Sequence, residues 1–208
     1  MRKDELSQHF LRSPRLALML IGHSNIKKRD LVLDIGAGSG VISYALSKRC
    51  REVWAIEPDH ETANKLRQNL RSRGVLAEGN PTHQARLNDA VKNRKNITPN
   101  VYVIEKDFLA MDLPQSSYKV FANPPFHLSS KIIHKLLESD NQPESFYLVL
   151  QKQFALKLLN TDRHYTSQLG KALISEFQTK IRYPLRPTDF TPPPAVPTVL
   201  FEAKKIDN

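Results

Sequence analysis

Short apolar runs alternate along this chain with stretches whose apolar residues repeat at helical spacing. A short continuous apolar run predicts a strand, and a repeat every three to four positions predicts a helix. We predict strands at residues 31–35, 53–56, 101–104, 120–122 and 146–150, and helices at residues 16–21, 41–49, 61–73 and 130–137. This alternation is typical of an α/β fold in which helices cover both faces of a parallel sheet.

Two stretches interrupt the alternation. Residues 74–100 are polar, basic and long for a link between a helix and a strand, so we predict an insertion there, either helical over 83–94 or a mobile loop. Residues 184–197 hold six of the fourteen prolines, and prolines this dense fit neither a central strand nor a helix. We therefore predict a final hairpin-like pair of strands, 177–183 and 198–203, joined by a stiff and extended connection.

The composition restricts the class of protein. With 208 residues, 40% of them hydrophobic, the chain is long and apolar enough for a packed core, and we expect one domain over residues 1–208. No apolar run approaches the ~18 residues of a membrane span, and the charged N-terminus lacks the apolar stretch of a signal peptide. The single Cys50 excludes an internal disulfide and a cysteine-built zinc site, and it suits a reducing cytosol.

A glycine-rich segment follows the first predicted strand and precedes a helix: residues 34–40 read Asp-Ile-Gly-Ala-Gly-Ser-Gly. Glycines let a ligand approach the backbone, and this turn of a doubly wound sheet is where nucleotide-like cofactors bind. The spacing differs from the Gly-x-Gly-x-x-Gly/Ala of dinucleotide sites, and no Gly-Lys-Ser/Thr of a phosphate-binding loop follows. The loop therefore favours a cofactor without a pyrophosphate; the alternative is a bare tight turn.

Two acidic residues follow the next two predicted strands. Glu57 ends the second strand, where an acid accepts hydrogen bonds from ribose hydroxyls. Asp107 follows the third strand, where it would accept from an adenine amino group while Phe108 covers the ring. Alone, Glu57 is explained as a solvated strand end and Asp107 as a helix cap. Because the carboxyl ends of successive parallel strands meet at one crevice, we predict a nucleoside-type cofactor there.

The fourth predicted strand ends in Asn123-Pro124-Pro125-Phe126. Two prolines fix φ and remove two N–H donors, so the loop presents acceptors and an aromatic ring on a stiff frame. The Asn123 side-chain oxygen and the Pro124 carbonyl suit the two N–H groups of a planar amine, and Phe126 suits stacking on a base. The alternative is a rigid turn with a buried Phe. No histidine, aspartate and glutamate cluster has the spacing of a metal site, so we expect no metal.

These motifs resemble those of the Erm-type adenine N6-methyltransferases of large-subunit rRNA, which share their fold with the small-subunit rRNA dimethyladenosine transferases. The resemblance covers nearly the whole chain, from Ser-Gln-His-Phe-Leu at residues 7–11 to Phe-Thr-Pro-Pro-Pro-Ala-Val at residues 190–196. It implies S-adenosylmethionine as cofactor, bound by Gln8, His9, Phe10, Asp34, Gly36, Gly38, Gly40, Glu57, Asp107, Phe108 and Asn123. It makes Asn123, Pro124 and Phe126 catalytic and Phe190 a second aromatic near the target base; from the residues alone, Phe190 equally anchors the hairpin.

The resemblance also implies a fold and an activity. The fold is a Rossmann-like class I methyltransferase with a seven-stranded, mostly parallel sheet and a C-terminal antiparallel hairpin. The activity is methyl transfer to N6 of an adenine in 23S rRNA, naked or in the assembling large subunit, with macrolide-type resistance as its consequence. We expect a cytoplasmic monomer without membrane contact. The alternatives are a small-subunit rRNA, DNA-adenine or protein-amide methyltransferase, and a non-catalytic rRNA assembly factor.

The chain departs from the family at two points. Members usually have Ile or Leu where Pro124 stands, although Asn-Pro-Pro-aromatic is common in other amino-methyltransferases. They also usually continue into a C-terminal helical domain, which we expect to be absent or vestigial here because the chain stops shortly after the last predicted strand. RNA binding would then rest on the catalytic domain.

The net charge of +10 suits such a partner, although an ordinary basic surface explains it equally. Residues 1–30 hold seven basic and three acidic residues, residues 61–100 eight and three, and residues 151–186 seven and two. We hypothesise that these three segments line the mouth of the active site and bind RNA phosphates. The alternative is that they are solvated helix faces.

Overall fold

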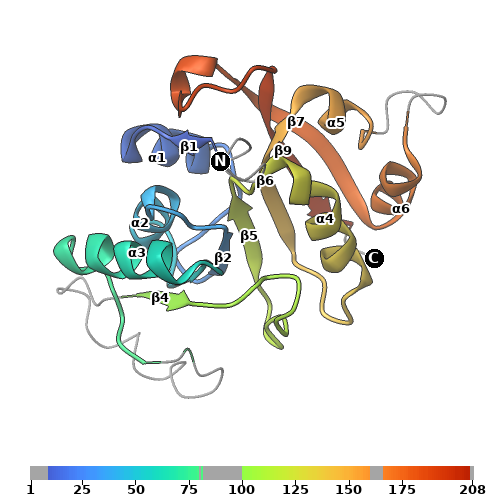
Figure 1. The fold of residues 1–208 in the computed structure, drawn as a ribbon. Helices are drawn as coiled ribbons and strands as arrows, with labels where there is room; N and C mark the ends of the chain where they lie inside the picture. Colours follow the sequence, from blue (N-terminus) through green and yellow to red (C-terminus); the bar gives the residue numbers. More distant parts are fainter. Residues whose placement is uncertain (1–8, 80, 82–99, 160–165, 207–208) are drawn as a thin grey trace.

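A computed structural model describes residues 9–79, 81, 100–159 and 166–206. Its centre is a seven-stranded sheet in the order β4-β3-β2-β5-β6-β9-β7 (Figure 1). The strands are β2 (Leu31–Ile35), β3 (Glu52–Ile56), β4 (Val101–Ile104), β5 (Lys119–Ala122), β6 (Ser145–Gln151), β7 (Phe177–Leu185) and β9 (Thr198–Lys205). The strands β4, β3, β2, β5 and β6 pair in parallel, and β9 pairs antiparallel with both β6 and β7. The predicted fold, including the antiparallel C-terminal pair, is confirmed.

Helices cover both faces of the sheet. The helices α1 (Pro14–Gly22), α2 (Val41–Ser47) and α3 (His60–Ser72) pack on one face, and α4 (Ser129–Glu138), α5 (Lys152–Leu156) and α6 (Gln168–Glu176) on the other. Successive residues of a strand alternate between the two cores, as in β2, where Leu33 joins the α4 side and Val32 the α1 side. Ser13 caps α1 as its sequence position predicts, accepting a hydrogen bond from the Leu16 amide.

Some boundaries differ from the sequence prediction. The helix predicted over 41–49 ends at Ser47. Residues 75–77, predicted as part of the insertion, belong to the core: Val75 is fully buried and Leu76 bridges Val101. The choice between a helix and a loop over residues 83–94 lies outside the described residues.

The proline-rich segment is more regular than predicted. Pro184 lies within β7 and pairs with Val199, and Pro187 begins the 3-10 helix η3 (Pro187–Asp189). A strand tolerates Pro184 because β7 is the edge of the sheet, where one side of the backbone needs no partner. A first helical turn tolerates Pro187 because its N–H would lack an acceptor in any case.

The sequence pattern missed a small two-stranded sheet that matters for the site. The strand β1 (Phe10–Leu11) pairs antiparallel with β8 (Phe190–Thr191), so the beginning of the described chain lies against its proline-rich segment. The amide of Arg12 extends this pairing by donating to the Asp189 carbonyl at 3.0 Å. Strands of two residues show no periodicity, so tertiary contact alone defines them.

Candidate active site

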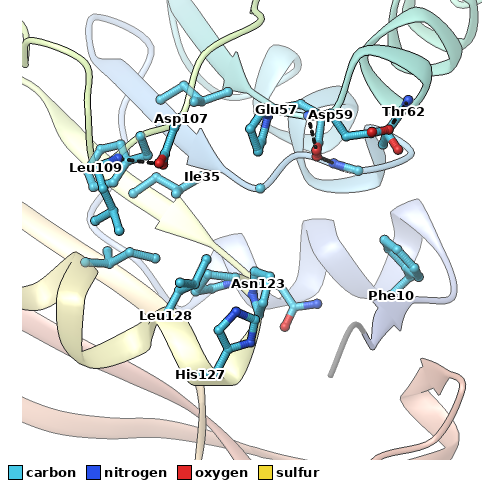
Figure 2. Close-up of a pocket in the computed structure, with 18 of the residues that line it drawn as sticks. Phe10, Ile35, Glu57, Asp59, Thr62, Asp107, Leu109, Asn123, His127 and Leu128 are labelled. Atoms are coloured by element: carbon cyan, nitrogen blue, oxygen red, sulfur yellow. Dashed lines mark hydrogen bonds between the residues drawn. The ribbon is translucent and has the colours of Figure 1, made fainter. Parts of the chain in front are cut away.

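A cavity of about 500 Å³ opens at the carboxyl ends of β2, β3 and β5. Figure 2 shows its two walls: Glu57, Asp59 and Thr62 lie across the cavity from Asn123, His127 and Leu128. Predicted site residues that line the cavity are His9, Phe10, Gly36, Gly38, Glu57, Asp107, Phe108, Asn123 and Pro124. The topology thus brings nine predicted residues from the N-terminal segment and four strand ends to one cavity. Gln8 lies outside the described residues.

The glycine loop and the end of β3 form the first wall. The Gly38 amide donates to the Glu57 carboxylate at 2.9 Å, and Gly38 has a positive φ of 53°. A Cβ at Gly38 would lie 2.8 Å from the Phe10 ring, so a side chain there fits neither the backbone angle nor the space. The loop, the acid and the N-terminal segment are therefore packed as one unit.

Glu57 is poised to bind hydroxyl groups. It is 8% exposed, and burial raises its pKa, while hydrogen bonds from the amides of Gly38 and Asp59 act in the opposite direction. A carboxylate held by two amides has lone pairs in fixed directions and keeps others for a ligand. This is the arrangement expected of an acid that accepts hydrogen bonds from vicinal hydroxyls.

Two residues of the glycine motif serve the fold and do not line the cavity. Asp34 is 1% exposed and accepts a hydrogen bond from the Ser43 hydroxyl at 2.5 Å, because alternate residues of β2 face opposite sides of the sheet. Burial raises the pKa of Asp34 to about 7. Gly40 begins α2 with a φ of 83°, and a Cβ there would lie 2.6 Å from Leu66 of α3.

Asp107 and Phe108 lie beyond the end of β4. The Asp107 carboxylate accepts from the Leu109 amide at 2.9 Å and is exposed, so it caps a turn as well as bordering the cavity. Phe108 is buried, with the Lys135 ammonium 5.5 Å from its ring centre. The sequence suggested a helix cap or a cofactor contact; a turn follows Asp107 in place of a helix, and capping this turn is compatible with a place at the cavity.

Asn123 is oriented by the N-terminal segment. Its amide nitrogen donates to the His9 carbonyl at 2.6 Å. Because a carbonyl only accepts, the nitrogen must face His9, and the side-chain oxygen is directed to the other side. Pro124, the next residue, is buried and lines the cavity. The wall built by this loop therefore offers acceptors, as its sequence predicts.

His9 also contacts the rest of the Asn-Pro-Pro-Phe loop. Its ring lies 5.4 Å from the Phe126 ring, centre to centre, and its Nδ1 lies 2.9 Å from the Pro192 carbonyl. These contacts connect the N-terminal segment, the Asn-Pro-Pro-Phe loop and the proline-rich segment. Phe126 is half-buried, beside the cavity rather than in its lining.

Phe190 lies in the core. It is 1% exposed, pairs with Leu11 across β1 and β8, and packs in the cluster that includes Leu185 and Leu200. This position favours the anchoring role over contact with a substrate base. The substrate-binding role implied by the family motif would require the ring to leave the core.

Sequence reasoning missed part of the lining. Asp59 caps α3 by accepting from the Thr62 amide at 2.8 Å, and both residues border the cavity. The Asp-x-x-Thr spacing before a helix was a signal for that cap. The remaining lining residues are Ile35, Ile56, Pro58, Glu61, Leu109, Pro125, His127, Leu128 and Ile132. The apolar ones give the cavity a surface for a flat ring.

The family model described as "Ribosomal RNA adenine dimethylase" matches residues 1–208. The chain belongs to this family. Its Rossmann-like fold and the cofactor of the family, S-adenosylmethionine, agree with the motifs that the sequence presents. The cavity fits this cofactor, because its lining combines the Glu57 carboxylate, which can accept hydrogen bonds from hydroxyls, with the backbone of Gly36 and Gly38 and with apolar side chains.

Two curated relatives are similar to this chain over most of its length. It is 30% identical over 200 residues to an "rRNA adenine N-6-methyltransferase" of Limosilactobacillus reuteri, covering 96% of this chain and 70% of the relative. It is 27% identical over 197 residues to a "Probable ribosomal RNA small subunit methyltransferase A" of Methanosphaera stadtmanae, covering 94% and 63%. The family match and these relatives make the chain an S-adenosylmethionine-dependent rRNA adenine methyltransferase, without deciding between 23S and 16S rRNA.

Solved structures show the same fold. A dimethyladenosine transferase from Plasmodium falciparum has a TM-score of 0.75 at 23% identity, over 95% of this chain and 64% of that one. The 23S rRNA methyltransferase ErmE has a TM-score of 0.75 at 22% identity, over 96% of this chain and 70% of that one.

Within the described residues, no helix is long and apolar enough to cross a membrane, and no metal-binding group of three ligands comes together.

Proposed function

We propose that this enzyme transfers a methyl group from S-adenosylmethionine to N6 of an adenine in 23S rRNA. The observation that carries the proposal is the pairing of two walls: Glu57 on one, and Asn123 with its amide nitrogen held by His9 on the other. The motifs at residues 7–11 and 190–196, which resemble those of the Erm-type enzymes, support the 23S target over the 16S one.

The first wall binds the cofactor. The Glu57 carboxylate accepts from the ribose hydroxyls, the Gly36 and Gly38 backbone lies against the ligand, and Asp107 with Phe108 holds the adenine. Phe10 packs over Gly38 near the methionine part, as the family motif implies for residues 8–10. When bound, S-adenosylmethionine supplies a methyl group already activated by its sulfonium. The protein therefore needs positioning and electrostatics more than a strong base.

The second wall holds the target amine. The Asn123 side-chain oxygen and the Pro124 carbonyl accept the two N–H groups, which favours a pyramidal nitrogen with its lone pair aimed at the methyl group. Phe126 stacks on the base beside His9. An adenine within a helix must leave its stack to reach this wall, so a looped or single-stranded target is favoured. The Pro-Pro dipeptide keeps both acceptors fixed.

A second candidate is an adenine in 16S rRNA. The Methanosphaera relative, which is named for the small subunit, favours it. The residues of the two walls would act in the same way, and only the RNA differs. If the target is 23S rRNA, we further propose macrolide-type resistance as the consequence, with the enzyme acting as a cytoplasmic monomer.

Radiolabelled S-adenosylmethionine offered with 23S rRNA, 16S rRNA, DNA and a protein mixture tests the proposal. We expect label in 23S rRNA, located at adenine N6 by mass spectrometry, with Asn123→Ala as the background control. Label in 16S rRNA alone would establish the second candidate. Label only in DNA or protein would overturn both. RNA binding without any label would indicate an assembly factor.

A further inference from the structure

Six exposed cations gather at the edge of the sheet away from the cavity. Lys27, Lys28 and Arg29 lie in the turn that leads into β2, Lys48 and Arg49 in the turn that leads into β3, and Arg73 at the end of α3. We call these six residues the strand-start patch. The end of α3 that carries Arg73 lies on the left of Figure 1, away from the arrowhead of β5. For Lys27, Lys28 and Arg29 this differs from the expectation that residues 1–30 line the active-site mouth, whereas His9 and Phe10 of the same segment do line the cavity.

The turns that carry the patch are bonded to one another. The Arg51 amide donates to the Asp30 carbonyl at 3.1 Å, which joins the first turn to the second. The Lys48 ammonium and the Arg73 guanidinium lie 4.9 and 4.5 Å from the centre of the Tyr44 ring. The cations therefore share one surface of fixed shape.

The nearby carboxylates do not neutralise the patch. Asp30 is engaged by the buried Lys119 ammonium at 2.7 Å and by the Lys27 amide at 2.7 Å. Glu52 accepts from the Trp54 indole at 2.8 Å. Among the residues that the structure describes, none of the six patch side chains makes an ion pair. Uncompensated cations that lie this close together repel one another, and binding of an external anion would relieve this repulsion.

Helix dipoles explain only part of the patch. Lys48 and Arg73 follow the C-terminal ends of α2 and α3, where a cation stabilises the helix. Lys27, Lys28 and Arg29 precede a strand and have no such role. Their turn is the part of the patch that fold stability does not require.

We propose that the strand-start patch binds the phosphate backbone of a second, distant segment of the folded rRNA substrate. This inference rests on the proposed function for the identity of the polyanion. Parallel strands start at one edge of the sheet and end at the other, and β2 alone separates the two edges by roughly 16 Å at ~3.3 Å per residue. At ~3.4 Å or more per nucleotide, an RNA of two nucleotides seated in the cavity is too short to reach the patch. The enzyme therefore recognises a folded RNA through two separated contacts.

The test compares two triple variants with the same change of charge. Lys27→Gln, Lys28→Gln and Arg29→Gln remove half of the patch. Lys131→Gln, Lys204→Gln and Lys205→Gln remove three exposed cations that lie outside the patch and outside the three basic segments. Affinity for full-length 23S and 16S rRNA transcripts is measured over a range of salt concentrations. We expect the patch variant to lower the slope of log affinity against log salt by about two, because each phosphate contact contributes ~0.7–0.9. The control should change the slope by less than about 0.5.

An adenine-containing dinucleotide, which is shorter than the distance from the cavity to the patch, is the second probe. Its affinity should be the same for the wild type and the patch variant, because it occupies the cavity alone. The inference would be overturned if both triple variants lost the same amount of slope. It would also be overturned if the patch variant lost as much affinity for the second probe as for full-length rRNA. The binding slopes do not depend on turnover. If the wild type methylates no rRNA, the proposed function is refuted, and the binding slopes still show whether the patch contacts RNA.

Discussion

The two walls of the cavity are built from opposite kinds of groups. The wall formed by the glycine loop and β3 combines the backbone of Gly36 and Gly38 with a buried carboxylate, Glu57. The wall formed after β5 contains two prolines, so its backbone lacks two donors and offers oxygen acceptors. A ligand rich in hydroxyls suits the first wall, and a ligand that presents N–H groups suits the second.

This difference separates binding from transfer. Under the proposed function, the carboxylate wall would contact the cofactor before and after the reaction, so its loss should weaken affinity. The acceptor wall would act on the amine while the new bond forms, so its loss should lower the rate of transfer. His9 and Phe10 touch both walls, since His9 holds Asn123 and Phe10 packs on Gly38. Glu57 and Asn123 each belong to a single wall, so a substitution of either residue should affect that wall and spare the other.

The largest expected effect follows from Asn123→Ala on the acceptor wall. It removes the acceptor for one N–H group of the target amine, so kcat should fall about 10²–10³-fold, as when one preorganised hydrogen-bonding group is removed from an active site. The affinity for S-adenosylmethionine, measured by calorimetry, should stay within about threefold of the wild-type value. Near-normal turnover would refute the role of Asn123.

Glu57→Gln tests the opposite wall. Hydrogen bonds to a charged group contribute about 1.5–3 kcal/mol, so the cofactor Kd should rise about 10–100-fold while kcat at saturating cofactor changes little. Glu105→Gln is the matched control, because Glu105 follows the neighbouring strand β4 but pairs with His60 and Arg67 outside the cavity. Equal losses in the two variants would show that Glu57 has no specific contact.

Asp34→Asn sharpens the contrast between the two acids, since Asp34 should affect stability rather than binding. The pKa of Asp34 in the folded protein, about 7, lies above the ordinary value of 3.8. At pH values between these two, the folded state therefore keeps a proton that the unfolded chain has lost. The free energy of unfolding therefore falls as pH rises from about 4 to about 7, by about 1.4 kcal/mol per unit at most. Urea unfolding at several pH values should show this slope in the wild type but not in the variant. Parallel curves of unfolding free energy against pH for the wild type and the variant would contradict this role of Asp34.

The smallest effect is expected from Phe126→Leu. Leucine keeps the apolar bulk and loses the flat face, so part of a stacking contribution of about 1–3 kcal/mol is lost and KM for RNA should rise about fivefold. The cofactor Kd should not change. Phe154→Leu, on α5, is a control for the loss of an aromatic ring. A change in cofactor affinity without a change in KM for RNA would place Phe126 on the cofactor wall and contradict its stacking on the target base.

Much of the site could be predicted from the sequence because strand ends in a parallel sheet lie at one edge. The glycine loop, Glu57, Asp107 and Asn123 each follow a predicted strand, and the structure brings their strand ends to one cavity. The prediction did not separate residues that line the cavity from those that support it. Asp34 and Gly40 differ from Gly36 and Gly38 only through the alternation along β2 and the contact with α3.

By itself, the sequence determined the order of the five parallel strands and of helices α1 to α4, the class of cofactor and the acceptor character of the loop after β5. These follow from local properties: apolar periodicity, glycine spacing and the missing N–H of proline. Helices α5 and α6 were not predicted. Tertiary structure alone decided that β1 pairs with β8, that His9 orients Asn123, and that Phe190 is buried. It also placed Lys27, Lys28 and Arg29 at the edge opposite the cavity. Such contacts join residues far apart in the chain, and no local pattern encodes which of them meet.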